Sequence, residues 1–145
     1  MKTMEQHAPQ GLRQESEISV SIPAGLLGFE AFKRYRLIRV PEEEPLMWFE
    51  MTDRVNHGFL VVSVQEVLPN YRPLVSQQDL DFLDIRNPAD MLLLCVVTMR
   101  EGEAFANLKG PIVINRQTMV GKQCVPGNVL DLSIEHPVPV LAAAA

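Results

Sequence analysis

The chain has 145 residues, of which 47% are hydrophobic and 21% are charged, and its formal net charge is −5. A single domain of this length buries roughly 70% of the surface of its unfolded chain, so its core needs neither a disulfide nor a metal. Acidic surfaces repel phosphate backbones, so the charge opposes an RNA-binding module and favours a basic protein partner.

The N-terminal segment and the longest apolar run bear on targeting and membrane insertion. Residues 1–14 mix charges, a proline and amides without an apolar segment, which is unlike a secretory leader. The longest apolar run, 91–97, is far shorter than the ~20 residues that cross a bilayer. We therefore expect a cytoplasmic protein with no membrane contact, divided into a flexible arm (1–16), one domain (17–137) and a fraying tail (138–145).

Short strands account for the first half of the domain. Ile18, Val20 and Ile22 alternate with polar residues, which is the pattern of a half-buried strand, and Pro23 ends it. Turn residues then separate three further apolar segments, for which the sequence predicts strands over 35–40, 46–51 and 59–64.

A helix precedes the second group of strands. Ser76 followed by Asp79 resembles a capping box, so a helix is expected from Ser76, and Asn87-Pro88 stops it. The nearly all-apolar segment 91–99 predicts a central strand that is buried on both faces. Further strands are predicted over 112–115, 123–125 and 129–134.

This succession of short strands and turns predicts a mainly all-β protein. Because closure of a sheet removes its exposed edges, we expect a small closed or nearly closed antiparallel β-barrel with one short helix. The alternative function for such a fold is a small ligand-binding or enzymatic β-barrel. That function needs a polar-lined pocket with convergent titratable groups, and the sequence names no such set.

Residue types that carry chemistry are present, but their patterns do not indicate catalysis or metal binding. His7, His57 and His136 lie far apart, and Cys95 falls within an apolar strand. Asp79, Asp81 and Asp84 are typical of a solvated helix start, where carboxylates are favoured. Cys124 shares no metal-ligand spacing with Cys95. The sequence therefore predicts no catalytic, metal or cofactor-binding residue.

Two short motifs have alternative interpretations. The spacing Gly25-Leu26-Leu27-Gly28 is that of an RNA-clamping loop, but leucines replace the polar residues which that loop needs. The basic cluster is either a solvated edge neutralised by the glutamates that follow it or a docking site for a helix with acidic groups. It comprises Lys33, Arg34, Arg36 and Arg39.

Several separated blocks occur in a fixed order along the chain. The first runs from Ile22 to Glu30 and reads Ile-Pro-Ala-Gly-Leu-Leu-Gly-Phe-Glu. Three single residues come next, the strand aromatic Tyr35, the proline Pro45 and the tryptophan Trp48. They are followed by the block Pro69-Asn70-Tyr71. The block from Asn107 to Asn115, with Gly121 and Gln123 after it, is Asn-Leu-Lys-Gly-Pro-Ile-Val-Ile-Asn. Together these blocks resemble the bacterial flagellar assembly factor FliW family. The chain departs from the family pattern at Phe105, Gly110 and Phe49-Glu50.

This resemblance implies a non-enzymatic monomer that binds flagellin and antagonises the translational repressor CsrA, coupling flagellin synthesis to export. Since the implied repressor binds RNA and is therefore basic, we expect it to meet acidic loop residues. The candidate partner-binding residues are those glutamates together with the side-chain amides of the family-like block: Glu42, Glu43, Glu44, Glu101, Glu103, Asn107, Asn115 and Gln123.

Overall fold

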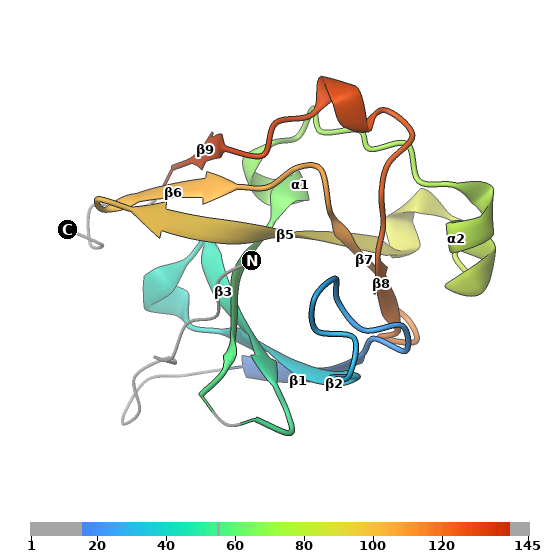
Figure 1. Ribbon diagram of the computed structural model, residues 1–145, viewed down its shortest axis with the longest axis horizontal. Helices are drawn as coiled ribbons and strands as arrows, with labels where there is room; N and C mark the ends of the chain where they lie inside the picture. The colour runs from blue at the N-terminus through green and yellow to red at the C-terminus, as the bar shows by residue number, and fades with distance from the viewer. Residues whose placement is uncertain (1–15, 55, 140–145) are drawn as a thin grey trace.

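The computed structural model describes residues 16–54 and 56–139 (Figure 1). Within these residues the chain forms nine strands, two short α-helices and three 3₁₀ turns. The strands are β1 (Ser16–Ser21), β2 (Arg34–Arg39), β3 (Leu46–Met51), β4 (Gly58–Ser63), β5 (Met91–Arg100), β6 (Glu103–Ala106), β7 (Ile112–Asn115), β8 (Gly121–Gln123) and β9 (His136–Val138). The helical segments are η1 (Pro41–Glu43), α1 (Val64–Val67), α2 (Gln77–Phe82), η2 (Pro88–Asp90) and η3 (Val129–Asp131).

The long strand β5 organises the sheet, as the apolar segment 91–99 predicts. Strands β1 to β5 follow one another as antiparallel neighbours. The first part of β5 pairs with β7, its middle with β4 and its last part with β6. Strand β8 pairs with β7, and β9 pairs with β6. Its residues from Leu92 to Val97 are buried, because alternate side chains of the strand belong to two different apolar clusters, one on each face of the sheet.

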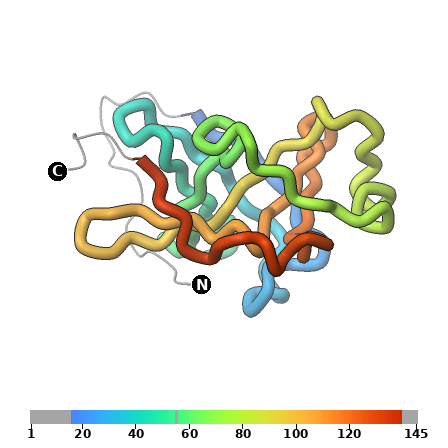
Figure 2. The backbone as a smooth tube through the Cα atoms, turned by 90° about the horizontal axis from the view of Figure 1, so that it is seen from above, coloured from blue at the N-terminus to red at the C-terminus, as the bar shows by residue number. Residues whose placement is uncertain are grey.

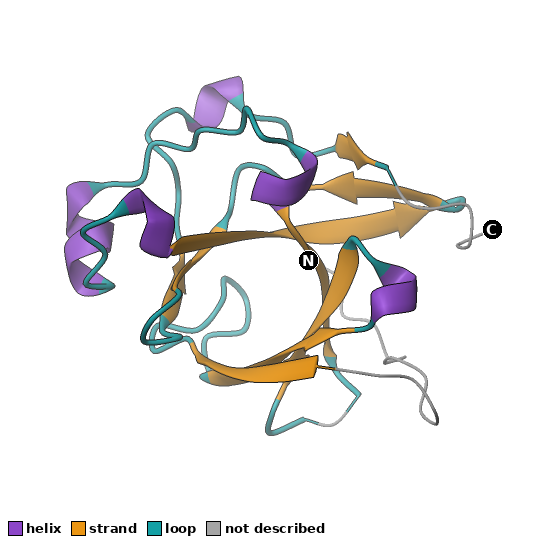
Figure 3. Cartoon of the chain, turned by 180° about the vertical axis from the view of Figure 1, so that it is seen from behind, coloured by secondary structure: helices purple, strands orange, loops and turns teal. Residues whose placement is uncertain are grey.

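The sheet curls strongly but is not closed by a ladder of hydrogen bonds (Figure 3). Strand β1 pairs only with β2 among the described strands, and a single bridge joins Ser21 to Val120 on its other side. The Ser21 N–H donates to the Met119 carbonyl at 3.0 Å. The structure is therefore a mainly antiparallel β-sheet, and the expected closed barrel is not confirmed.

Both faces of the curled sheet are covered, so the strands contribute to two apolar clusters. Side chains alternate between the faces of a strand. In β4, Phe59 and Val61 accordingly belong to the cluster enclosed by the curl, whereas Leu60 and Val62 belong to the outer one. Tyr35 and Phe49 stack in the enclosed cluster, with ring centroids 4.5 Å apart. The outer cluster also includes residues of α1, β6 and β9.

The start of the helix expected from Ser76 is confirmed, but the helix already ends at Phe82, before Asn87-Pro88, and it is one of two short α-helices in the described part. The Ser76 hydroxyl accepts a hydrogen bond from the Asp79 N–H at 3.1 Å, which caps α2. The other helix, α1, begins at Val64, where the sequence predicts a strand. The chain leaves the sheet there because the Gln65 side chain takes the place of the next strand residues. Gln65 donates to the Met91 carbonyl and accepts from the Leu93 N–H, each at 3.0 Å.

Two predicted strands near the C-terminus are wrong in whole or in part. Residues 129–134 form η3 and a loop, in which Leu130 is 91% exposed and the Leu108 N–H donates to the Ser133 carbonyl. Of the predicted strand 123–125, Gln123 alone lies in β8. The sequence predicts no strand at β6 or β9, because their few residues show no clear alternation, but the two strands pair with each other.

Paired strands lie at both ends of the described part of the chain. Residues 1–15 of the expected arm and 140–145 of the expected tail lie outside the described residues, whereas Ser16 begins β1 and the buried Val138 ends β9. Among the described helices, none has the length and apolar character needed to cross a membrane.

Candidate functional site

Two family-like blocks that are far apart in sequence meet at one surface. The Leu27 N–H, in the loop after β1, donates to Gln123 Oε1 at 2.8 Å. The same side chain donates from Nε2 to the Gly110 carbonyl at 3.1 Å. Gln123 thus joins the loop over 22–30 to the turn that precedes β7.

The loop over 22–30 turns one leucine into the core and the next into solvent. Gly25 and Gly28 have φ values of 71° and 86°, which glycine adopts without strain. A Cβ atom at Gly25 would overlap the backbone of Glu30. Leu26 is fully buried and Phe29 packs edge-on against Phe59 of β4. With these anchors in place, Leu27 remains 77% exposed.

An open groove of about 480 Å³ lies between the loop and the turn, and we call it the Leu27 groove. Leu27 and Val125, which is 73% exposed, are its apolar rim residues. Gly110, Gln123 and Glu30 also border it. Exposed apolar side chains around a hollow are typical of surfaces that bind protein partners.

The predicted residue Asn107 also lines the Leu27 groove, together with Lys109. The Asn107 side chain accepts a hydrogen bond from the Lys109 N–H at 2.9 Å, which shapes the turn. Lys109 donates from Nζ to the Val129 carbonyl at 3.0 Å. Asn107 and Gln123, two of the candidate partner-binding residues, therefore lie at one surface.

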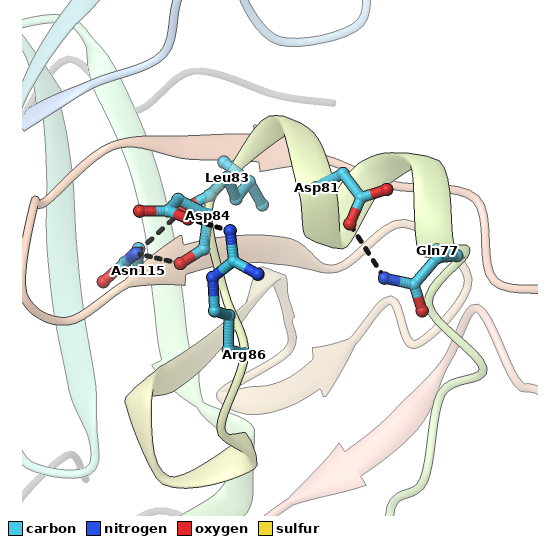
Figure 4. A network of polar contacts seen from close by, with 6 residues as sticks. All are labelled: Gln77, Asp81, Leu83, Asp84, Arg86 and Asn115. Atoms are coloured by element: carbon cyan, nitrogen blue, oxygen red, sulfur yellow. Dashed lines mark hydrogen bonds and ion pairs between the residues drawn. The ribbon is translucent and has the colours of Figure 1, made fainter.

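Asn115 has a different position, inside the protein. It is 4% exposed, and its Nδ2 donates to the carbonyls of Leu83 and Asp84 at 2.9 and 3.3 Å (Figure 4). Its Oδ1 accepts from the Gln117 N–H at 2.8 Å. These bonds hold the end of α2 against the β7–β8 turn. The amide is occupied within the chain, so its role in this structure is to join two elements.

The three aspartates of the helical region have separate surroundings. Asp81 accepts from Gln77 Nε2 at 2.8 Å, and Asp84 pairs with Arg86 at 3.2 Å (Figure 4). Asp79 is nearly buried, and Lys122 donates to it from Nζ. Each carboxylate thus has its own partner.

The five predicted glutamates gather at one end of the molecule, which we call the acidic end. Glu42, Glu43 and Glu44 lie in and just after η1, and Glu101 and Glu103 lie at the tip of the β5–β6 hairpin. Figures 1 and 2 place both segments at the same end of the protein. Glu43 is half-buried, and the other four glutamates are exposed.

Part of the basic cluster is neutralised by neighbouring carboxylates. Arg36 pairs with Glu50 across the β2–β3 ladder at 2.5 Å, and Arg39 lies 3.9 Å from Glu44. These pairs support the interpretation of a compensated edge. They also explain why Glu50 tolerates burial, since its charge has a partner.

The departures from the family pattern fit their surroundings. Phe105 is half-buried in β6, and the Arg100 guanidinium lies 4.5 Å from its ring centroid. Gly110 lies beside the Gln123 amide, which a Cβ at Gly110 would approach to 3.1 Å.

The cysteines are buried and both are free. Burial raises the pKa of the Cys95 and Cys124 thiols to about 12, so both are protonated at neutral pH. Within residues 16–54 and 56–139, no group of three or more His, Cys, Asp or Glu residues is placed to hold a metal ion. The observed features define a small antiparallel β protein with two candidate protein-binding surfaces, the Leu27 groove and the acidic end.

Comparison with known proteins gives the family. The family model described as FliW protein matches residues 3–138. The flagellar assembly factor FliW of Leptospira interrogans is 38% identical over 128 residues, which cover 85% of each protein. The FliW of Clostridioides difficile is 33% identical over 122 residues, covering 83% of this chain and 93% of that relative. A crystal structure of the flagellar assembly factor FliW matches with a TM-score of 0.72 and 25% identity, over 82% of this chain and 84% of the other. The chain belongs to the FliW family.

Of the residues that line the Leu27 groove, the sequence singles out Asn107 and Gln123 as candidate partner-binding residues, but not Leu27 or Val125. The sequence predicts a strand at Val125, which is exposed, and the hydrogen bond between Gln123 and Leu27 leaves no local pattern in the sequence. The one available signal was that both partners fall within family-like blocks.

Proposed function

We propose that this protein is a non-enzymatic cytoplasmic flagellar assembly factor that binds flagellin and antagonises a CsrA-type translational repressor. The observation that carries the proposal is membership of the FliW family, whose curated relatives are named flagellar assembly factors. In this proposal the protein acts as a monomer and contacts no nucleic acid itself.

The charge distribution supports the acidic end as the surface that meets the repressor. A protein that binds RNA presents lysine and arginine side chains to phosphates. The same basic surface is complementary to the five glutamates of the acidic end. Such complementarity mainly increases the association rate and orients the encounter.

The exposed aliphatic side chains support the Leu27 groove as the surface that meets flagellin. Leu27 and Val125 offer an apolar contact whose strength depends little on salt. Occupancy of the two surfaces is negatively coupled in this proposal, with a coupling free energy of about 1–3 kcal/mol, as is typical of linked sites.

The test is a gel-shift assay with flagellin leader RNA, the repressor, purified flagellin and this protein. We expect no shift by this protein alone at physiological salt, and weaker binding of the repressor to RNA when the protein is added. Addition of flagellin is expected to restore the repressor–RNA complex. An unchanged repressor–RNA affinity at saturating concentrations of this protein would refute the proposal.

A further inference from the structure

The two terminal strands of the sheet differ in how their outer edges are protected. Strand β9 contains Pro137 and is followed by Pro139, and proline lacks the N–H that a further strand would need. Strand β1 is a six-residue edge strand without proline, so every residue in it keeps its N–H. The next proline along the chain, Pro23, lies beyond the end of the strand. The edge of β1 is thus open to pairing where that of β9 is blocked.

The hydrogen-bond pattern shows which backbone groups of β1 point outward. In an antiparallel pair, successive residues face the partner strand and the open side alternately. Ser21 uses its N–H on the open side, toward Met119. Ser19 and Glu17 therefore face the same way, and neither has a backbone partner there among residues 16–54 and 56–139.

A cavity of about 300 Å³ lies beside this open edge. Ser16 and Ile18 of β1 border it on one side, and Leu92 of β5 and Arg116 belong to other walls. Ile18 is 49% exposed, although its neighbours Leu37 and Leu92 in the cavity are buried. The cavity therefore offers apolar surface next to unpaired backbone groups.

The charged groups around the cavity favour an anionic ligand group. Arg39, Arg116 and Glu66 line it, and because Arg39 is already paired with Glu44, Arg116 is the cation left for a ligand. The Arg116 guanidinium makes no ion pair or hydrogen bond with the described residues, so it is available to a carboxylate.

From these observations we infer a peptide-binding site at β1. An extended segment of a partner protein adds as a strand to the open edge, with main-chain hydrogen bonds to Glu17 and Ser19. One aliphatic side chain of the segment enters the cavity beside Ile18, and an adjacent carboxylate faces Arg116. Strand addition of this kind takes affinity from the main chain and specificity from alternate side chains. The inference does not depend on the proposed function, because it uses neither the Leu27 groove nor the acidic end.

Fluorescence anisotropy with the full chain tests this inference. The probes are fluorescent heptapeptides of sequence Thr-Val-Thr-X-Glu-Val-Thr, with Ala, Val, Leu, Ile or Phe at X. We expect the Leu or Ile peptide to bind about tenfold more tightly than the Ala peptide, because it fills the cavity. Methylation of the peptide's backbone nitrogens should abolish binding. If no peptide binds, or if the methylated peptide binds equally well, strand addition is wrong.

A pair of variants at one position isolates the main-chain contact. Ser19→Pro removes the outward N–H and leaves the β1–β2 ladder, which uses Ile18 and Val20, in place. It should weaken peptide binding about tenfold, whereas Ser19→Ala, which keeps the N–H, should bind like the wild type. Equal binding by both variants, with unchanged melting temperatures, contradicts the inference.

Amide hydrogen exchange in the free protein distinguishes other occupants of the edge. We expect the Glu17 and Ser19 amides to exchange rapidly without peptide and to become protected when it binds. Protection in the free protein that persists on dilution would assign the edge to residues 1–15 of the same chain. Protection that dilution removes would assign it to a second copy. Either result overturns the inference.

Discussion

The Gln123 side chain accepts a hydrogen bond of 2.8 Å from the backbone N–H of Leu27, a residue 96 positions earlier in the chain. With its second bond, to the Gly110 carbonyl, it fixes both walls of the Leu27 groove. The orientation of Leu27 is therefore decided by one side chain from β8 as well as by the loop's own glycines.

Substitution of Gln123 tests this dependence. Gln123→Ala removes both hydrogen bonds and should lower the free energy of unfolding by about 1–2 kcal/mol. The Leu27 amide should also exchange faster with solvent. Gln123→Glu is the matched control, because it keeps the acceptor for Leu27 and loses the donor to Gly110. If the exchange of the Leu27 amide is the same in all three proteins, other contacts hold the loop.

Charge reversal tests the acidic end. Changing Glu42, Glu43 and Glu44 to Lys should slow association with the repressor and flatten its salt dependence, since rim charges act mainly on the encounter. Flagellin binding should survive. Surface plasmon resonance at low and high salt measures both effects.

A second triple variant controls for net charge in that experiment. Reversing Asp53, Asp81 and Asp131 to Lys changes the net charge equally at exposed positions away from the acidic end. Repressor association at the wild-type rate in the Glu42–Glu44 variant, or equal slowing in both variants, would exclude a local role for these glutamates.

Replacing each of two buried tyrosines with phenylalanine should change the free energy of unfolding in opposite directions. The Tyr35 hydroxyl is buried without a hydrogen-bond partner in the described structure, whereas the Tyr71 hydroxyl donates to the Leu108 carbonyl at 2.7 Å. Tyr35→Phe should raise the free energy of unfolding by about 1 kcal/mol, and Tyr71→Phe should lower it by about 1 kcal/mol. Urea denaturation of both variants measures this. A loss of stability in Tyr35→Phe would reveal a partner for its hydroxyl.

The ion pair between Asp79 and Lys122 predicts how stability depends on pH. Burial raises the pKa of the Asp79 carboxyl, but the hydrogen bond and the positive charge of Lys122, together with the polar neighbours Cys124 and Ser76, outweigh it and hold the pKa below its ordinary value of 3.8. A carboxyl with a lowered pKa stabilises the fold above its unfolded pKa, and this contribution is lost as the pH falls through the folded pKa.

Acid denaturation curves measure this contribution. Asp79→Asn should have a lower free energy of unfolding at neutral pH and a smaller further loss below about pH 4 than the wild type. Asp131→Asn, at an exposed position, is the matched control. If Asp79→Asn and wild type lose stability in parallel on acidification, the ion pair does not contribute.

The sequence by itself determined the elements whose signals are local. The alternation of Ile18 and Val20 and the apolar run of β5 specify strands, because side-chain period and burial are properties of neighbouring residues. Ser76 and Asp79 specify the start of α2 for the same reason, since a cap joins residues three positions apart.

Tertiary structure decided the features that depend on distant partners. Gln65 ends β4 by bonding to β5. Strand β6 forms because it pairs with β5, and β9 forms because it pairs with β6, rather than through their own alternation. The same holds for function-bearing surfaces. Gln123 orients Leu27 across the fold, and Asn115, named with it from one block, is buried against α2. Such contacts join residues tens of positions apart, so their energies leave no periodic pattern in the chain, and folding alone brings the groups together.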